Sequence, residues 1–529
     1  MLFNSLVLLG TFKFLQVGVY AVAASSKRGG GPVVNLSYAT FEGASTGGLE
    51  TFLGIPYAQP PVGDLRFRRP QPPLSLSGTK LATTYGNACF PQEHTPPHIP
   101  GINYTILARF RPKANASEDC LYANVVRPAG VTEQSNLPVV VWFYGGAFAI
   151  GDGSSYDGST VVQRSVELGE PVIYVNFNYR LNAFGFLGGK EALAGGAANI
   201  GLYDQKFFLD WVKAYISKFG GDPNQVTAWG QSAGSQSIIA HILTNPASPP
   251  FKAAILNYQA TYDQLVQFTG CASAPDTLKC LRAAPYATLA DAVNTTPSFL
   301  SLNGLDLTWA ISVDGELIQK TTKQYINEGC CYARVPILGG QVDDEGTFFT
   351  LDDQSITTDA DLKAFLKAGL YLGATDAQVN SAADKYPQDP AAGSPFDTGN
   401  RSALTPEFKR LAAIQGDLHF QSGLWKRNKH SLYLGSVHGG ELPEMYGLTG
   451  DHLGTDATVN FVNHQDPNHP EGSTAASVLS NIAWPKYDLD SKKMFLFSDN
   501  ATEEYTTAPD TYRADAIAAI IKVQTALGQ

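Results

Sequence analysis

Residues 225–234, with the sequence QVTAWGQSAG, join a short apolar run directly to the pattern Gly-x-Ser-x-Gly. The run at 225–229 is typical of a buried strand, and the residues at 235–243, SQSIIAHIL, are typical of a helix. A sharp turn between a strand and a helix holds its serine in a strained backbone conformation and lifts the hydroxyl above the sheet edge. The glycines leave room for the close approach of neighbouring backbone. Ser232 is therefore a candidate nucleophile.

The same five-residue pattern also occurs in a different context. GASTG at 43–47 lies between two strand-like runs, 36–41 and 49–55, and consists mainly of residues that favour tight turns. We expect Ser45 to lie in a hairpin turn. The position between a strand and a helix, and not the pattern alone, selects Ser232.

Outward from this turn, apolar runs alternate with helical patterns. Apolar runs predict buried strands at 137–143, 171–176, 253–256, 335–339 and 431–434. Apolar residues near helical spacing predict a helix within 199–219. Buried strands that alternate with helices indicate an α/β fold, in which helices cover both faces of a mostly parallel central sheet. The site of such a sheet lies at the carboxyl ends of its strands, where Ser232 falls.

Length and composition favour one large domain. The 529 residues are 44% hydrophobic and 16% charged, and no repeat or long low-complexity linker divides them, so we read 25–529 as one catalytic domain with insertions. The net charge of −11 argues against a nucleic-acid partner and offers no basic stripe for anionic membranes. Because no H-E-x-x-H, C-x-x-C or Walker pattern occurs, the sequence predicts neither a metal nor a cofactor.

The start of the chain predicts export. Its apolar run ends in small residues and indicates a signal peptide at 1–24, although no Lys or Arg precedes the run. Lys27 and Arg28 form either a dibasic processing site or a pair of solvated charges. No later run reaches the roughly 18 apolar residues of a membrane span, and 516–527 predicts only a short amphipathic helix. We therefore expect a secreted, extracellular protein without a transmembrane segment.

Cysteines and sequons fit an exported chain. Six cysteines allow fifteen pairings, so the sequence alone leaves the connectivity open. The natural pairs bracket a short and a longer loop: Cys271 with Cys280, and Cys89 with Cys120. Adjacent cysteines rarely meet disulfide geometry, so we expect at least one buried free thiol at Cys330 and Cys331. Candidate glycosylation sites are Asn35, Asn103, Asn115, Asn294, Asn400 and Asn500.

A serine that transfers acyl groups needs a base, an acid that orients the base, and donors for the oxyanion. Nine histidines are present, and most of them lie in no recognisable motif. His438 differs because it follows strand-like residues, 432–437, and precedes Gly439-Gly440-Glu441. A base after a late strand, beyond the acid in the chain, is the expected order for an α/β-hydrolase. His438 is therefore the candidate base.

For the acid, the segment 339–346, GGQVDDEG, places three carboxylates just past a predicted strand. Asp343 and Asp344 could instead cap a helix. We choose Glu345, which precedes a glycine, although periodicity alone does not separate it from Asp344.

For the oxyanion, YGGAF at 144–148 follows the predicted strand at 137–143. Its small residues let backbone N–H groups face the cleft, and Ala233, the residue after the nucleophile, supplies a further N–H. An ordinary glycine turn would look similar in isolation, but the later Gly-x-Ser-x-Gly turn argues against it.

Several longer motifs occur in a consistent order from about Val33 to the C-terminal region. They are GIPYAQPP at 54–61, LRF at 65–67, SEDCLY at 117–122, NYR at 178–180, FGGDP at 219–223, GQSAG at 230–234, DEGTFF at 344–349 and VHGGE at 437–441. Together they resemble the type-B carboxylesterase/lipase family, the cholinesterase-like group that includes Candida rugosa-type lipases.

The resemblance implies an α/β-hydrolase fold with Ser232, Glu345 and His438 as its triad. It implies oxyanion donors, disulfides and structural ion pairs: the N–H groups of Gly146, Ala147 and Ala233, the disulfides Cys89–Cys120 and Cys271–Cys280, and the pairs Arg66–Glu118 and Arg180–Asp204.

Three positions depart from the family pattern. Ala147 stands where the family often has a third glycine, which keeps the N–H but adds a methyl group. Gln231 stands where many relatives carry glutamate, so one negative charge is missing beside the nucleophile. Asn257-Tyr258-Gln259 replaces a usual Gln-Ser-Gly, which puts a serine behind the triad in doubt. None of these changes removes a catalytic group.

The loop at 90–119 resembles the lid of such lipases, because it carries enough apolar residues to cover a lipid-facing mouth. Its prolines are equally typical of a fixed surface loop. The loop contains no tryptophan, which argues against a cholinesterase. A glycan on Asn103 would project from its outer face.

We therefore expect a secreted serine ester hydrolase, a carboxylesterase or lipase that works through an acyl-serine intermediate. Its partner would be a small-molecule or lipid ester, with a lipid–water interface as one setting, and Phe148, Phe348 and Phe349 are candidates for its acyl pocket. Alternatives are a sterol esterase, a short-chain carboxylesterase or a feruloyl-type esterase. A non-catalytic cholinesterase-like binding protein is the rival of another class, and the complete triad argues against it.

Overall fold

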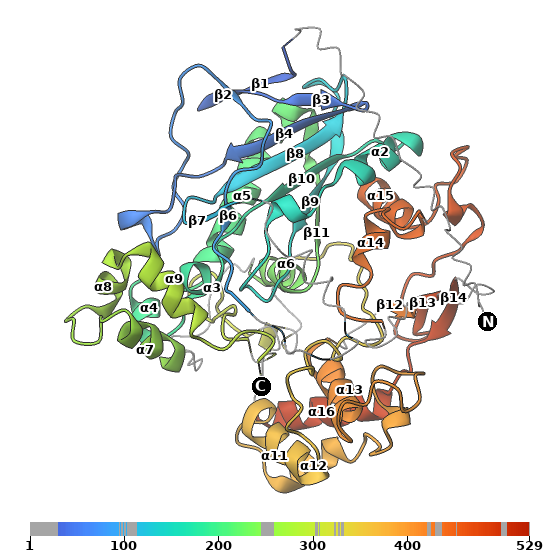
Figure 1. The fold of residues 1–529 in the computed structure, drawn as a ribbon. Helices are drawn as coiled ribbons and strands as arrows, with labels where there is room; N and C mark the ends of the chain where they lie inside the picture. The colour runs from blue at the N-terminus through green and yellow to red at the C-terminus, as the bar shows by residue number, and fades with distance from the viewer. Residues whose placement is uncertain are drawn as a thin grey trace, which may run out of the picture.

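A six-stranded sheet forms the centre of the molecule in the computed structural model (Figure 1). Its strand order is β11-β9-β10-β8-β4-β3. The strands are β3 (Ala44–Thr46), β4 (Leu49–Pro56), β8 (Tyr122–Pro128), β9 (Leu137–Phe143), β10 (Ile173–Phe177) and β11 (Gly221–Gly230). The structure describes residues 30–94, 96, 99, 102, 114–244, 259–301, 305, 307–321, 324–325, 328, 333–420, 425–428, 436–450, 452–498 and 505–527.

The sheet has a parallel part and an antiparallel part. Strands β9, β10 and β11 run parallel, whereas β8 is antiparallel to both β10 and β4, and β3 is antiparallel to β4. The described sheet is therefore more antiparallel than the sequence predicts. Antiparallel neighbours need no crossover helix between them. The sequence predicts no helix between the early strands, where a parallel pair would need one. The candidate nucleophile lies at the end of β11, in the parallel part.

Helices cover both faces of this sheet, as the sequence predicts. Neighbouring residues of β9 point to opposite faces, because side chains alternate along a strand. The Trp142 ring contacts Tyr446, on the side where α2 (Ser159–Glu167) and α15 (Leu453–His464) pack against the sheet. The Phe143 ring contacts Phe177 5.0 Å away, on the side of α5 (Ile200–Tyr215) and α6 (Ala233–Leu243).

Smaller elements surround the central layers (Figure 1). The remaining strands are β1 (Val33–Leu36), β2 (Ala39–Glu42), β5 (Thr79–Leu81), β6 (Ala88–Cys89), β7 (Ala116–Ser117), β12 (Trp425–Asn428), β13 (Lys493–Ser498) and β14 (Tyr505–Pro509). The remaining α-helices are α3 (Asn182–Phe186), α4 (Lys190–Ala194), α7 (Gln259–Phe268), α8 (Thr277–Ala283), α9 (Tyr286–Asn294), α11 (Asp359–Phe365), α12 (Asp376–Ala383), α13 (Phe408–His419), α14 (Leu442–Met445) and α16 (Ala514–Leu527). Short 3-10 or π turns are η1 (Gly63–Leu65), η2 (Gly153–Ser155), η3 (Ile216–Phe219), η5 (Leu366–Leu370), η6 (Pro390–Ala392) and η7 (Val478–Asn481).

A second apolar cluster lies away from the sheet, where α11, α12, α13 and α16 gather at the bottom of Figure 1. Leu366, Leu411 and Ile520 are buried within it. Helix α16 is the C-terminal helix that the sequence predicts, and its apolar side packs into this cluster. Within the described ranges, no helix is both long and apolar enough to cross a bilayer.

The second Gly-x-Ser-x-Gly segment forms a hairpin, as predicted. Ser45 itself, however, lies in the strand just before the turn. Ser45 is an exposed residue of β3 and pairs with Glu50 of β4. The turn itself is formed by Gly47 and Gly48, whose φ angles are 61° and 82°. Glycine adopts positive φ without steric cost, so the two adjacent glycines set the place of the turn.

The predicted strand at 335–339 is wrong. This segment has no regular structure, and Val335 and Ile337 are 49% and 66% exposed. A run of only five residues carries little periodicity, and Pro336 has no N–H to give to a sheet. The other two late strands predicted, at 253–256 and 431–434, lie outside the described residues.

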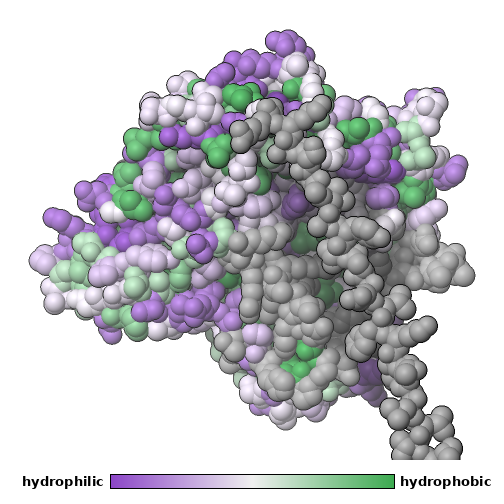
Figure 2. Space-filling model, turned by 45° about the horizontal axis from the view of Figure 1, so that its top comes forward, coloured by the Kyte–Doolittle hydropathy of each residue, from purple (hydrophilic) through white to green (hydrophobic). Residues whose placement is uncertain are grey.

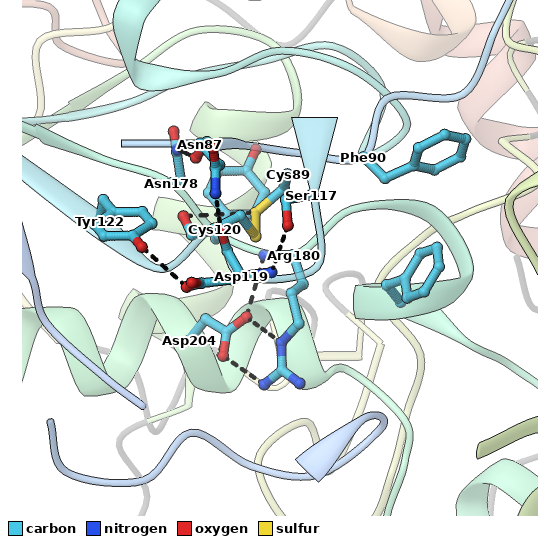
Figure 3. Close-up of a disulfide and its surroundings, with 12 residues drawn as sticks. Asn87, Cys89, Phe90, Ser117, Asp119, Cys120, Tyr122, Asn178, Arg180 and Asp204 are labelled. Atoms are coloured by element: carbon cyan, nitrogen blue, oxygen red, sulfur yellow. Dashed lines mark hydrogen bonds and ion pairs between the residues drawn. A yellow bond between two sulfur atoms is a disulfide. The ribbon is translucent and has the colours of Figure 1, made fainter. Parts of the chain in front are cut away.

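Two disulfides and two largely buried ion pairs support the fold, and Figure 3 shows one of each, Cys89–Cys120 and Arg180–Asp204. The disulfides join Cys89 to Cys120 and Cys271 to Cys280. Both ion pairs use an arginine held by two bonds to one carboxylate: Arg66 with Glu118, and Arg180 with Asp204, at shortest distances of 2.5 Å and 2.7 Å. Paired in this way, these buried charges are structural. Cys330 and Cys331 lie outside the described residues.

The two disulfides are expected to differ in what they contribute to stability. Cross-linking restricts the unfolded chain, and the restriction grows with the length of the closed loop. The sequence separations are 31 residues for Cys89–Cys120 and 9 for Cys271–Cys280. Replacing both cysteines by alanine should lower the free energy of unfolding by about 4 kcal/mol for the first pair and about 3 kcal/mol for the second. Urea unfolding of the two double variants tests this, and a reversed order would contradict it.

Three of the predicted glycosylation sites are exposed at the surface. Asn35, Asn115 and Asn400 are exposed, whereas Asn294 is half-buried and accepts a hydrogen bond from the N–H of Glu93. On the coloured part of the face in Figure 2, hydrophilic residues predominate and apolar ones occur in small groups. Asn103, Asn500, the predicted signal peptide and much of the lid-like loop lie outside the described residues.

Candidate active site

Ser232 occupies the turn between β11 and α6. Its backbone has φ 55° and ψ −125°, a region that residues with a side chain rarely adopt. The turn is closed by a hydrogen bond from the N–H of Gly234 to the carbonyl of Gln231, 2.9 Å long. The strain predicted from the Gly-x-Ser-x-Gly pattern is therefore present, and the serine stands at the carboxyl end of a parallel strand.

The glycines of the pattern are required by close packing. A Cβ on Gly234 would lie 2.0 Å from the carbonyl oxygen of Phe143 in β9, and one on Gly230 would lie 2.8 Å from the carbonyl carbon of Gly234. Neither position has room for a side chain. Their absence of side chains lets α6 begin directly against the central sheet.

Glu345 and His438 form a hydrogen-bonded pair at the same end of the sheet. Oε2 of Glu345 lies 2.5 Å from Nδ1 of His438. The other carboxylate oxygen, Oε1, accepts a hydrogen bond of 2.9 Å from the N–H of Val342, which fixes the carboxylate. A carboxylate only accepts, so the ring proton sits on Nδ1 and the lone pair of a neutral ring is on Nε2.

Opposing influences act on the pKa of His438, and the net effect raises it. Burial favours the neutral ring and lowers the pKa, but the charge of Glu345 and its hydrogen bond outweigh burial, with a smaller contribution from Glu441. The Glu345 carboxylate therefore stabilises an imidazolium at this position.

Asp344, which periodicity could not separate from Glu345, has a different task. Its Oδ2 accepts from the N–H of Ser436, and its Oδ1 accepts from the hydroxyl of Ser394 and the N–H of Phe396. The N–H of Asp344 donates in turn to the carbonyl of Ser436. Burial, with the nearby charge of Asp343, raises the pKa of Asp344 to about 6. Asp344 thus ties the segment before His438 to the segment that carries Glu345.

The three residues predicted to supply oxyanion amides line the same pocket as Ser232. Gly146 and Ala147 follow β9 with φ angles of 115° and 56°, and Ala233 begins α6. The N–H groups of Ala149 and Ile150 both donate to the carbonyl of Gly146, which holds this turn. Within the described part of the chain, no acceptor bonds to the N–H of Gly146, Ala147 or Ala233. These amides are therefore available to a ligand.

A pocket opens over these groups, and the empty space within it and at its open mouth is about 690 Å³. Its floor contains Gly146, Ala147, Ser232, Ala233 and His438. Apolar side chains form most of its wall: Ile150, Phe299, Leu305, Leu307, Phe348, Phe349 and Phe420. Gln231, Gln236 and His419 add polar atoms. An apolar pocket with few polar groups is typical of a site for a small organic ligand.

The predicted acyl-pocket residues divide into two groups. Phe348 and Phe349 line the pocket, and the Phe349 ring lies 5.2 Å from the ring of His438. Phe148 is not part of the lining, because its side chain is buried against Phe186, at 4.5 Å between ring centroids.

Sequence reasoning missed a part of the wall and one polar group in it. Phe299, Leu305, Leu307 and Phe420 lie far from every motif and carry no signal of their own. His419, in no motif, lines the pocket at the end of α13, and burial lowers its pKa to about 4, so its ring is neutral near neutral pH. Its neighbour Phe420 packs 4.8 Å from the His438 ring, a contact that no pattern in the sequence signals.

The site combines a serine on a strained strand-to-helix turn, a carboxylate–imidazole pair, and backbone amides that are free to bind a ligand. On a sheet covered by helices, these features define a serine hydrolase of the α/β-hydrolase class. The chain belongs to the carboxylesterase family, whose family model matches residues 30–390. It is a carboxylic-ester hydrolase, as the sequence predicts.

Individual relatives agree with this assignment. Lipase 4 of Diutina rugosa is 37% identical over 510 residues, which cover 88% of this chain and 91% of the relative. Secreted lipase 1 of Botryotinia fuckeliana strain B05.10 is 35% identical over 524 residues, covering 89% and 90%. The crystal structure of Aspergillus niger EstA has a TM-score of 0.77 at 25% identity and covers 94% of this chain and 99% of that one. The predicted fold class and family are thereby confirmed.

Proposed function

We propose that Ser232, His438 and Glu345 are the nucleophile, base and acid of this hydrolase. The observation that carries the proposal is the 2.5 Å contact between Glu345 and His438 in the pocket that holds Ser232. With its proton on Nδ1, the ring keeps a basic lone pair on Nε2. The raised pKa of His438 means that the ring accepts a proton more readily than an isolated imidazole.

In the proposed reaction, Ser232 Oγ attacks the ester carbonyl while His438 Nε2 takes the serine proton. Collapse of the tetrahedral intermediate breaks the bond to the alcohol, and His438 returns the proton to the departing oxygen. Water then attacks the acyl-serine in the same way and releases the acid. Glu345 keeps the ring oriented and stabilises the imidazolium in both halves.

The amides of Gly146, Ala147 and Ala233 would bind the oxyanion of each tetrahedral intermediate. They come from two rigid elements, the turn after β9 and the start of α6, so they need no rearrangement when charge develops. The start of α6 also places the positive end of the helix dipole beside this charge.

The pocket supports an ester with an apolar acyl group. Phenylalanine and leucine side chains dominate its wall, and similar proteins include named lipases. Action at a lipid–water interface, with the 90–119 loop as a lid and a glycan on Asn103, belongs to this proposal. So does secretion through the signal peptide at 1–24, which agrees with relatives that are named as secreted.

A series of p-nitrophenyl esters of increasing chain length, with and without detergent, tests this function. We expect kcat/KM to rise from acetate to the medium-chain esters, because each added methylene can be buried against the apolar wall. A rate that stays flat or falls with chain length would argue for a small or aromatic acid instead. A fluorophosphonate probe should label the protein at Ser232. An unlabelled and inactive protein would favour the non-catalytic alternative.

A further inference from the structure

Gln231 contacts the nitrogen of His438 that the proposed reaction uses. Its side-chain Nε2 lies 3.2 Å from Nε2 of His438. The residue is only 7% exposed, and its side chain packs over Gly145, where an added Cβ would lie 2.9 Å from Oε1 of Gln231. Its carbonyl is held by Gly234 in the turn. The amide is therefore confined beside the base.

The direction of this hydrogen bond follows from the other side of the ring. Nδ1 of His438 faces the Glu345 carboxylate, which can only accept, so Nδ1 carries the proton of the neutral ring. Nε2 then has only a lone pair, and Gln231 must be the donor. Among the described residues, Ser232 Oγ makes no hydrogen bond to the ring. The lone pair that would take the serine proton therefore already accepts a hydrogen bond from Gln231.

The other atom of the same amide lacks a partner. Oε1 of Gln231 is buried and, within the described part of the chain, accepts no hydrogen bond. A buried acceptor without a donor is costly. When Nε2 of His438 carries a proton, the amide N–H faces another N–H, and a half-turn of the amide would present Oε1 in its place. The imidazolium is therefore the partner that this oxygen lacks.

We propose that Gln231 is a positioning residue that acts through His438. Its N–H occupies Nε2 of the neutral ring in the free enzyme, and its rotated carbonyl accepts the N–H of the imidazolium. The inference rests on the proposed triad. It means that Ser232 reacts only in the fraction of molecules in which the amide has released Nε2.

Two substitutions remove the donor of the amide, one together with the acceptor and one without it. Gln231→Met keeps the length of the side chain and removes both donor and acceptor. Gln231→Glu is nearly isosteric and keeps only acceptors, so it favours the imidazolium alone. The charged groups that already act on this ring are Glu345 and Glu441, and both remain in these variants.

The experiment measures the rate of covalent labelling by a fluorophosphonate from acidic to alkaline pH. Labelling forms a bond from Ser232 Oγ to phosphorus, expels fluoride and passes the serine proton to His438. On the alkaline plateau, Gln231→Met should react about fivefold faster than the wild type, the size of one lost hydrogen bond. In Gln231→Glu, the acid limb of the profile should move up by about one pH unit, because a carboxylate stabilises the imidazolium.

Gln225→Met is the matched control, because Gln225 lies exposed on the same strand and, within the described chain, its side chain bonds only to Asp222. It should keep the wild-type rate and profile. Wild-type rates in Gln231→Met, together with an unmoved acid limb in Gln231→Glu, would overturn the proposal while the triad stands. An unlabelled wild type would instead count against the triad. Thermal melting shows whether each variant is folded. The near-isosteric Gln231→Glu still provides a test if Gln231→Met does not fold.

Discussion

Replacing Ser232 with alanine should lower kcat for ester hydrolysis by roughly a million-fold, as loss of the serine does in serine proteases with a triad. The reason is that, among the residues the structure describes, no other hydroxyl stands on the strained turn that carries Ser232. The oxyanion amides remain, so a residual rate above that of water is expected. The measurement is kcat on a p-nitrophenyl ester with the concentration of folded enzyme determined independently.

Ser45→Ala is the control for this experiment, because Ser45 lies in the other Gly-x-Ser-x-Gly segment and is exposed in β3, away from the pocket. It should retain full turnover. The fold of Ser232→Ala should be intact, since alanine meets the same backbone strain as serine at this φ. A Ser232→Ala protein that keeps more than about 1% of the wild-type kcat would place the nucleophile elsewhere.

Local motifs with a steric cause were the most predictable part of this protein. The strand–Gly-x-Ser-x-Gly–helix pattern requires glycines at 230 and 234 because adjacent backbone fills the space of their side chains. The strands β9 and β10 and the helix α5 were visible because long apolar runs and helical periodicity are strong signals. The order of motifs along the chain then pointed to His438 and to a group of three carboxylates, 343–345, and the structure brings His438 together with Glu345.

Features that depend on distant contacts were not predictable. The pocket wall draws Phe299, Leu307 and Phe420 from segments separated by more of the chain than any periodicity spans. Phe148 looked suitable because it follows the oxyanion segment, yet its side chain is buried in the core against Phe186. Asp344 and Glu345 are adjacent acidic residues, and only their hydrogen bonds distinguish them. Asp344 accepts from the N–H groups of Ser436 and Phe396 and holds the loop, whereas Glu345 bonds to the His438 ring.

Replacing Glu345 with glutamine is expected to lower kcat by about ten-thousand-fold, with little change in the fold. The amide can donate to Nδ1 of His438, which moves the ring proton to Nε2 and leaves that nitrogen unable to accept from Ser232. The pKa should move too. In the wild type, Glu345 raises the pKa of His438 against the opposing effect of burial. Without that charge, burial dominates and the pKa falls.

The sign of the pH effect follows from the state that the reaction needs. His438 must be neutral to take the serine proton, so activity is lost as the pH falls through its pKa. The residual activity of Glu345→Gln should therefore persist to lower pH than that of the wild type. Glu345→Asp keeps the charge and should retain a raised pKa with a smaller loss of kcat. If Glu345→Gln stayed within tenfold of the wild type with the same acid limb, the orienting carboxylate would have to be another group, and Asp344 would be the first to replace.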